Sequence, residues 1–355
     1  MSRPPNKVGR AFVYMDITNL KKALTGQPAY RYKQVNLAIF GQLINSWAEA
    51  TGLPKDLREK LQAECPLEIQ AEVIADKRSE KAGIVLADGS IIESVLIKNS
   101  DGRNTVCVSS QVGCPLKCAF CATGQNGFRR NLTVDEIIMQ VLFFARQLKL
   151  KEERVDNVVF MGMGEPFLNT ENVLSAVKSL NDKEGLNIGA RNISISTSGL
   201  PEGIHALTKF PLQINLAISL HAPNDNLRQT LMPIAKKYNL KSIWRALKDY
   251  LEIKNRKLMF EYIMIDGVND SDKQAQELGE LLLELPKHLL MVNLIPYNLS
   301  LDSAGSSEFK PSKAGRIETF KKILFRRGIE TTIRESLGSS ISGACGQLAG
   351  KRNLR

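Results

Sequence analysis

The sequence predicts an α/β fold built on a parallel sheet, and two features of the chain support this. Strand-like and helix-like stretches alternate over most of its length, with strands expected at 104–110, 157–164, 192–199, 215–221, 258–265 and 291–297. Nearly every one of these strands is followed by polar, glycine or proline residues. Regular alternation is typical of a parallel sheet, open or curled into a barrel, whose functional residues lie beyond the carboxyl ends of the strands. We therefore expect the polar segments that follow these strands to form one composite site.

The residues before this alternation predict two smaller units. Apolar residues at three- and four-residue spacing predict short helices at 16–24, 32–47 and 53–62. Apolar and polar residues then alternate from 67 to 97 around the turn sequence "ADGS", which predicts a β-hairpin.

The helices between the later strands are expected at 133–148, 242–253, 271–285 and 314–328. The first of these begins with Thr133 and Glu136 in a capping-box pattern, and a Ser- and Gly-rich loop at 300–312 precedes the last. We divide the chain into a helical N-terminal accessory domain (1–66), a hairpin extension (67–103), the α/β domain (104–330) and a C-terminal segment (331–355).

Composition restricts the class of protein. A hydrophobic content of 43% with 24% charged residues is ordinary for a globular chain and excludes a fibrous or disordered one. The net charge of +11 favours a polyanionic partner, although a solvated basic surface would give the same balance. The N-terminus lacks the pattern of a signal peptide, and no uninterrupted apolar stretch is long enough to span a membrane. The sequence thus predicts a cytoplasmic protein.

Three of the six cysteines, Cys114, Cys118 and Cys121, follow the spacing C-x3-C-x2-C. In a chain without a secretion signal, such clustering indicates a metal centre or catalysis rather than a disulfide framework. Three thiolates can hold a 4Fe–4S cluster with one iron left open for a ligand. The alternative is a tetrahedral zinc site in which Cys107, seven residues upstream, is the fourth ligand.

Several collinear motifs resemble those of one known family. They are "CVSSQVGCPLKCAFCATGQNGFRRNLT", "FMGMGEPFLN", "ISTSG", "AISLHAPND", "VNLIPYN" and "ACGQLAG". Together they are similar to the RlmN/Cfr family of radical S-adenosylmethionine RNA adenosine methyltransferases, over residues 30–350. The resemblance implies a partial (β/α)6 radical SAM barrel with a helical accessory domain. It also implies a 4Fe–4S cluster and two S-adenosylmethionine molecules per turnover.

The resemblance assigns chemistry to residues outside the cysteine triad. Cys345 would carry a methyl group, Cys107 would resolve a covalent protein–RNA adduct, and Glu93 would remove the ring proton. The competing interpretations are a small buried hydrophobic side chain for Cys345 and an exposed strand carboxylate for Glu93. No motif surrounds Cys65, so we expect it to be structural.

The same resemblance places seven residues around S-adenosylmethionine: Gly164, Glu165, Ser196, Ser219, Leu220, His221 and Asn293. Among these, Glu165 can accept hydrogen bonds from an ammonium group. The motif position of His221 indicates a wall of the cofactor site rather than a general base.

The expected substrates are 23S rRNA and tRNA, methylated at C2 of an adenosine. C8 methylation and a non-catalytic iron–sulfur RNA-binding protein are the alternatives. Both chain ends are basic, and Arg129 and Arg130 beside the cysteine loop are candidate phosphate contacts. A flavodoxin-like reductant and a monomeric state are also expected. One departure from the family is the lead-in "LGSSISG" before Ala344 and Cys345, which usually is acidic and Ala-rich.

Overall fold

A computed structural model of the chain describes residues 17, 19–299 and 309–349. The N-terminal helices are α1 (Leu20–Ala23), α2 (Ala29–Asn36) and α3 (Lys55–Glu64). Helix α2 continues as a π-helical turn, Leu37–Gly41, and stops there, well before the predicted end at residue 47. Residues 16 and 18 of the first predicted helix lie outside the described residues.

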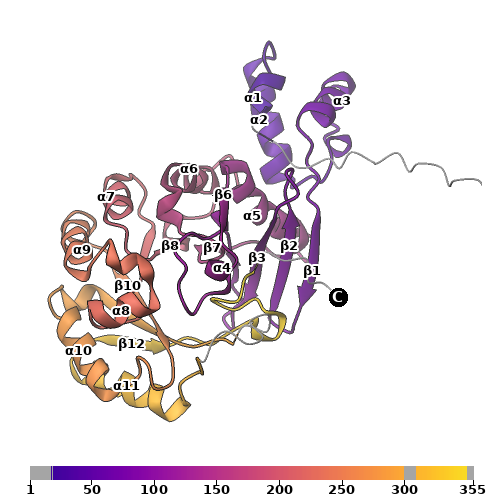
Figure 1. The fold of residues 1–355 in the computed structure, drawn as a ribbon. Helices are drawn as coiled ribbons and strands as arrows, with labels where there is room; N and C mark the ends of the chain where they lie inside the picture. Colours follow the sequence, from indigo (N-terminus) through magenta and orange to yellow (C-terminus); the bar gives the residue numbers. More distant parts are fainter. Residues whose placement is uncertain (1–16, 18, 300–308, 350–355) are drawn as a thin grey trace, which may run out of the picture.

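Ten strands of the described residues form one continuous sheet, in the order β1-β2-β3-β4-β7-β8-β9-β10-β11-β12. Figure 1 shows this sheet curving, with helices α5, α6, α7, α9, α10 and α11 arranged along its outer side. The order is linear and does not close on itself. The predicted partial barrel is thereby confirmed as a curled, open sheet.

The region predicted as a hairpin contains three antiparallel strands, β1 (Ala71–Ala75), β2 (Ser79–Val85) and β3 (Ile91–Lys98). The predicted turn at 87–90 joins β2 to β3, whereas β1 is an additional strand that pairs with β2. Strand β3 also pairs antiparallel with β4, so the extension continues the barrel sheet. The prediction of a two-stranded hairpin missed β1 because the pairing of strands is a tertiary contact, which the local alternation of apolar and polar residues does not encode.

The six predicted barrel strands are β4 (Asn104–Cys107), β7 (Asn157–Phe160), β8 (Ile193–Thr197), β9 (Asn215–Ser219), β10 (Leu258–Met264) and β11 (Leu290–Pro296). All neighbouring pairs among them are parallel. Among the described residues a further parallel strand, β12 (Glu330–Ile333), pairs with β11. This strand was not predicted, because its four residues include two threonines and an exposed glutamate rather than an apolar run.

The barrel helices are α5 (Val134–Lys149), α6 (Thr170–Asn181), α7 (Pro201–Lys209), α8 (Asp225–Leu231), α9 (Leu240–Lys254), α10 (Asp272–Leu282) and α11 (Ala314–Arg326). Helix α5 begins with the predicted capping box, in which the Thr133 hydroxyl accepts from the Glu136 amide. No helix in the described parts of the chain is long and apolar enough to cross a membrane.

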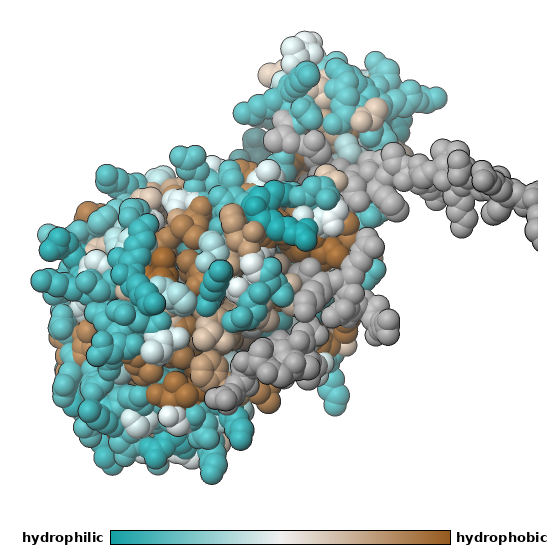
Figure 2. Space-filling model, viewed as in Figure 1, coloured by the Kyte–Doolittle hydropathy of each residue, from teal (hydrophilic) through white to brown (hydrophobic). Residues whose placement is uncertain are grey.

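One hydrophobic core runs from the N-terminal helices into the barrel. Trp47, Leu61 and Leu67 belong to the same cluster of buried residues as the apolar side chains of the barrel strands. Figure 2 shows hydrophilic residues over the outer surface and hydrophobic residues exposed toward the middle of the view. The N-terminal helices therefore pack onto the barrel and share its core, rather than forming a domain with a core of its own.

Candidate active site

Two cavities lie inside the curled sheet and meet at its middle. The upper cavity lies at the carboxyl ends of the strands, and its lining includes Phe160, Ser196 and Ser219. The lower cavity, of about 410 Å³, lies at the amino ends, and its lining includes Asn157 and Asn215, the first residues of β7 and β9. The expectation of one composite site beyond the carboxyl ends therefore describes only the upper cavity.

The cysteine triad lies in a loop beside the upper cavity, and local geometry closes that loop. A two-stranded ribbon, β5 (Gln111–Gly113) and β6 (Phe128–Asn131), brackets it, and α4 (Ala122–Gln125) follows the third cysteine. Gly113 has φ +78, and a Cβ there would lie 2.0 Å from the carbonyl oxygen of Gly127. The Cys114 amide donates to that carbonyl at 2.8 Å. Only glycine permits this approach.

The three thiols of the loop are largely buried. Burial raises the pKa of Cys114 to about 12 and that of Cys118 well above its usual value, so their thiolates need a bound cationic centre. The described residues hold no group of three or more His, Cys, Asp or Glu placed around one metal ion. Cys107 lines the lower cavity instead, which argues against its role as a fourth zinc ligand.

Glu165 is held in place by the ends of two strands. Its carboxylate accepts from the Thr197 hydroxyl at 2.7 Å and from the amides of Ser198 at 2.7 Å and Phe167 at 3.0 Å. Burial nevertheless raises the pKa of this carboxyl. Gly164 precedes it with φ +98, which a side chain would disfavour. Both residues line the upper cavity.

Five of the seven predicted cofactor residues line the upper cavity: Gly164, Glu165, Ser196, Ser219 and His221. The hydroxyls of Ser196 and Ser219 lie 3.2 Å apart. Leu220 and Asn293 are buried but are not among the lining residues. Asn293 instead lies behind Glu261, to whose carboxylate its side-chain amide donates at 2.8 Å.

His221 is neutral and fixed. Burial and the nearby Arg228 charge lower the pKa of His221 to about 3. Its Nδ1 accepts from the Ile263 amide at 3.1 Å, and its ring packs edge-to-face on Phe120. A neutral imidazole with this partner forms a wall of the cavity, as its motif position predicts.

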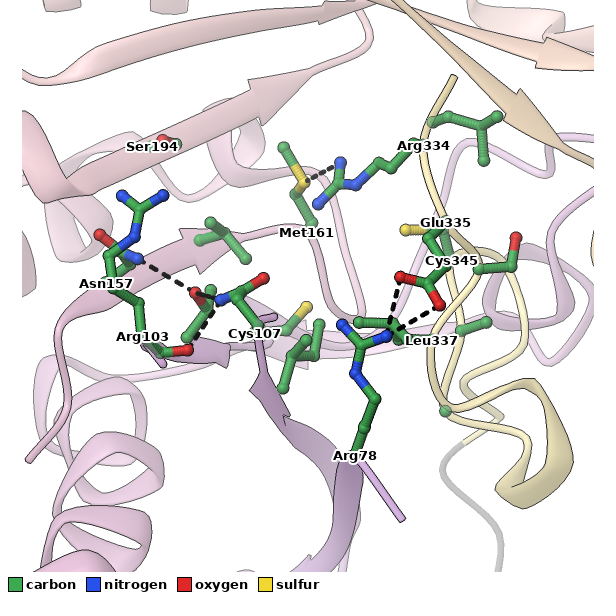
Figure 3. Close-up of a pocket in the computed structure, with 18 of the residues that line it drawn as sticks. Arg78, Arg103, Cys107, Asn157, Met161, Ser194, Arg334, Glu335, Leu337 and Cys345 are labelled. Carbon is green, nitrogen blue, oxygen red and sulfur yellow. Dashed lines mark hydrogen bonds and ion pairs between the residues drawn. The ribbon is translucent and has the colours of Figure 1, made fainter. Parts of the chain in front are cut away.

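Cys107 and Cys345 enter the lower cavity from different elements, as Figure 3 shows: Cys107 from the end of β4 and Cys345 from the C-terminal segment. Cys345 lines the upper cavity as well. Burial raises the pKa of Cys107 to about 12. Cys345 is half-buried and faces two cavities, so the interpretation of a small buried hydrophobic side chain is wrong for it.

Sequence reasoning did not find the arginines of this site. Arg334 lines both cavities, lies 3.5 Å from a Glu261 carboxylate oxygen and contacts the Met161 sulfur (Figure 3). Arg78, Arg103 and Arg191 line the lower cavity. A signal was available only for Arg334, which lies eleven residues before Cys345 in the basic C-terminal segment.

The C-terminal segment is fastened on two sides. One guanidinium nitrogen of Arg78 donates to both carboxylate oxygens of Glu335 at 2.9 Å, and Ser340 donates to Asp76 at 2.8 Å (Figure 3 shows the first of these). On the other side, α4 and the turn after it bind the tail through three contacts: Ala122 N to Gly346 O, Thr123 Oγ1 to Leu348 O and Asn126 Nδ2 to Ala349 O. The unusual lead-in is therefore an ordered loop.

Glu93 is not in either cavity lining. It is 4% exposed, so the interpretation of an exposed strand carboxylate is wrong. Its side chain pairs with Lys81 at 2.9 Å and accepts from the Ala349 amide at 2.5 Å. Glu93 therefore touches the same C-terminal segment that carries Cys345.

The two candidate phosphate contacts beside the cysteine loop differ. Arg129 is exposed, whereas Arg130 is engaged by Asp88 at 2.8 Å and by Glu136 at 2.7 Å. Because these ion pairs neutralise its guanidinium, Arg130 holds the ribbon in place and is not a free cation for RNA phosphates. Cys65 is buried in the core, consistent with its structural interpretation.

A curled parallel sheet with a three-cysteine loop at its carboxyl end defines a radical S-adenosylmethionine protein. The profile of the Radical SAM superfamily matches residues 108–278. The chain accordingly uses a 4Fe–4S cluster and S-adenosylmethionine. The triad and the upper cavity fit these two groups, since three thiols lie beside a cavity with a buried carboxylate.

The particular family follows from close relatives. "Probable dual-specificity RNA methyltransferase RlmN" of Thermosipho melanesiensis is 43% identical over 93% of this chain and 94% of its own. The protein of the same name from Roseiflexus sp. is 39% identical over 96% of each chain. A crystal structure of a radical SAM methyltransferase from Sphaerobacter thermophilus superposes with a TM-score of 0.89, at 41% identity, over 95% of this chain and 98% of that one. The chain belongs to the RlmN family of radical SAM RNA methyltransferases.

Proposed function

We propose that this protein methylates C2 of an adenosine in 23S rRNA and in tRNA, through a methyl group carried by Cys345. The name of its relatives, dual-specificity RNA methyltransferase, supports two RNA substrates. The motifs "GMGEP", "SLHAPND" and "ACGQLAG" resemble the C2 branch of the family. We further infer a monomer that is reduced by a flavodoxin-like carrier.

The observation that carries the proposal is the placement of the two thiols. Cys345 faces the cofactor cavity and the lower cavity, whereas Cys107 faces only the lower one. A methyl group accepted on the upper side can therefore be presented to a base on the lower side with little movement. A resolving thiol in that same lower cavity can reach the Cys345 sulfur afterwards.

The residues then act in order. The Cys345 thiolate takes a methyl group, and S-adenosylhomocysteine leaves. When bound, the cluster and a second S-adenosylmethionine supply the radical that removes a hydrogen atom from this methyl group. The carbon adds to C2, the ring proton leaves to Glu93, and the oxidised cluster, when bound, would take up the one electron that the adduct gives up. The Cys107 thiolate attacks the Cys345 sulfur, the sulfur–carbon bond breaks, and the product carbon keeps the electron pair and takes a proton. A dithiol reductant restores both thiols.

We propose that Glu93 is the base that removes the proton from C2 of the adenine ring. The support is its position: it is buried, and it already binds the backbone of the segment that carries Cys345. Reaching the base requires Glu93 to exchange its Lys81 and Ala349 contacts for the substrate. Replacing it by Gln should leave methylation of Cys345 intact and slow loss of the ring proton, measured as slower product formation from normal RNA.

The lower cavity is the proposed entry for the flipped adenosine. Three arginines of its lining, Arg78, Arg103 and Arg334, are paired with Glu335, Asp101 and Glu261, so Arg191 is the guanidinium that it offers to phosphate. Side-chain amides such as Asn157, Asn215 and Asn298 offer hydrogen bonds to base edges. Its volume of about 410 Å³ is within the range of small-molecule sites.

The test uses labelled RNA and reconstituted protein on denaturing gels. Cys107→Ala should accumulate protein covalently attached to RNA, because nothing releases the adduct. Cys345→Ala should give neither adduct nor methylated RNA. Cys65→Ala is the matched control and should behave as the unaltered protein, because Cys65 is buried in the core and lines neither cavity.

The outcomes separate the alternatives. Methylated RNA from Cys345→Ala would overturn the methyl-cysteine route. Mass spectrometry of nucleosides that found 8-methyladenosine would replace C2 by C8 chemistry. RNA binding with neither product nor adduct from the unaltered protein would leave only a non-catalytic binder.

A further inference from the structure

Arg228 is a buried cation that the reaction above does not use. It is 0% exposed, and its guanidinium donates to the carbonyl oxygens of Ser198 at 2.5 Å and Leu220 at 3.2 Å. Two longer contacts reach the carbonyls of Ser219 and Tyr238, each at 3.4 Å. Within the described residues, no Asp or Glu forms an ion pair with it.

The helix that carries Arg228 is packed on the cysteine loop. The Ala119 amide, next to Cys118, donates to the carbonyl of Leu231 in α8 at 2.9 Å. Leu231 and Leu227 lie in the same hydrophobic cluster as Cys114 and Cys118. Because Arg228 lies in this same short helix, it is held near the loop that carries Cys114 and Cys118.

A buried guanidinium without a counter-charge is costly, even when its N–H groups are hydrogen-bonded to neutral carbonyls. The negative groups around Arg228 are Cys118, Asp225 and Glu165. Asp225 binds the Leu240 amide, and the Glu165 oxygens are taken by Thr197, Ser198 and Phe167. These donors are neutral, so both carboxylates keep their charge, and the thiolates of a bound cluster would add further negative charge on the side of Cys118.

We propose that Arg228 is a positioning residue whose fixed charge raises the reduction potential of the cluster. It also ties together the carboxyl ends of β8 and β9, through Ser198 and Leu220, where two walls of the cofactor cavity begin. A positive charge stabilises the reduced, more negative cluster relative to the oxidised one, and burial leaves this attraction weakly screened. The inference rests on the cluster and not on which RNA carbon is methylated.

Two substitutions separate the effect of the Arg228 charge from the effect of its hydrogen bonds to the strand ends. Arg228→Met removes the charge and all donors, whereas Arg228→Lys keeps the charge and loses most carbonyl contacts. The reconstituted proteins are compared by iron content and by the midpoint potential, followed by EPR of the reduced cluster. We expect Arg228→Met to bind iron with a potential lowered by about 59 mV, a tenfold change in the one-electron equilibrium constant. Arg228→Lys should keep most of the original potential while melting at a lower temperature.

Arg146 provides the matched control. It is also buried, donates to one backbone carbonyl, that of Leu67, and forms no ion pair with Asp or Glu in the described part of the chain, but it lies on α5 against the N-terminal region. Arg146→Met should lower the melting temperature and leave the potential unchanged. Equal reduction potentials for Arg228→Met, Arg228→Lys and the unaltered protein would overturn the proposal. Arg228 would then only hold the ends of β8 and β9 together. If Arg228→Met fails to fold, Arg228→Gln offers a smaller change for the same measurement, and its unchanged potential would also overturn it.

Discussion

Single residues at this site are constrained by the backbone as much as by their chemistry. Gly164 has φ +98, and a Cβ at this position would lie 2.6 Å from the Cβ of Gln111. Gln111 in turn accepts from the Glu165 amide at 2.9 Å. The glycine therefore allows the carboxylate of Glu165 to be aimed at the cofactor cavity.

Gly164→Ala should weaken S-adenosylmethionine binding and destabilise the fold by about 1–3 kcal/mol, because the side chain is strained and displaces Gln111. Equilibrium binding and thermal melting measure the two effects. Gly315→Ala is the control, since a Cβ on Gly315 in α11 meets nothing within 4 Å and helix propensity favours alanine. Unchanged cofactor affinity in Gly164→Ala would show that this backbone conformation is not needed.

At the scale of elements, a short ribbon carries the cluster loop, and ion pairs hold it. Arg130 of β6 joins Asp88, in the turn between β2 and β3, to Glu136 in the first turn of α5. The Arg130 hydrogen bond lowers the pKa of Asp88 to about 2 from an ordinary 3.8. Three elements distant in the sequence are thus fastened next to the cysteines.

The stability from Asp88 should depend on pH in one direction. Its pKa is lower in the folded chain, so its contribution is present above about pH 4 and is lost as the pH falls toward 2. The melting temperature of Arg130→Gln should therefore lie below that of the unaltered protein at pH 6, and the gap should narrow on acidification. Asp101→Asn serves as the control, because the Asp101–Arg103 pair is largely exposed and joins only one loop. A gap that stays constant from pH 6 to pH 3 would contradict the assignment.

At the scale of the whole molecule, the barrel holds two cavities that share Arg334 and Cys345 in their linings. The cofactor side holds the cysteine loop, and the other end holds Arg78, Arg103 and Arg191. The shared core also shows that the N-terminal helices are part of this body, so deleting them would expose apolar surface as well as remove charge. Point substitutions are the cleaner probe of electrostatics.

RNA affinity should fall linearly with the logarithm of salt concentration, because phosphate contacts release counterions. Arg191→Gln should reduce the magnitude of this slope by about 1, the value for one lost phosphate contact. Lys241→Gln, an exposed change at the start of α9 outside both cavities, should not alter it. Filter binding between low and physiological salt measures both. Equal slopes for the two variants would exclude the lower cavity as the phosphate-binding end.

The sequence by itself determined the barrel strands, the capped helix at Thr133 and the cysteine triad, because each depends on residues close together in the chain. Six collinear motifs, of which one surrounds Cys345, also indicated the family. Only the tertiary structure decided that Cys345 opens onto two cavities, that Glu93 is paired with Lys81 and that Arg130 is already neutralised. It likewise revealed β12, Arg334 and Arg228. These features come from side chains that meet across the curled sheet, and local periodicity carries no information about such contacts.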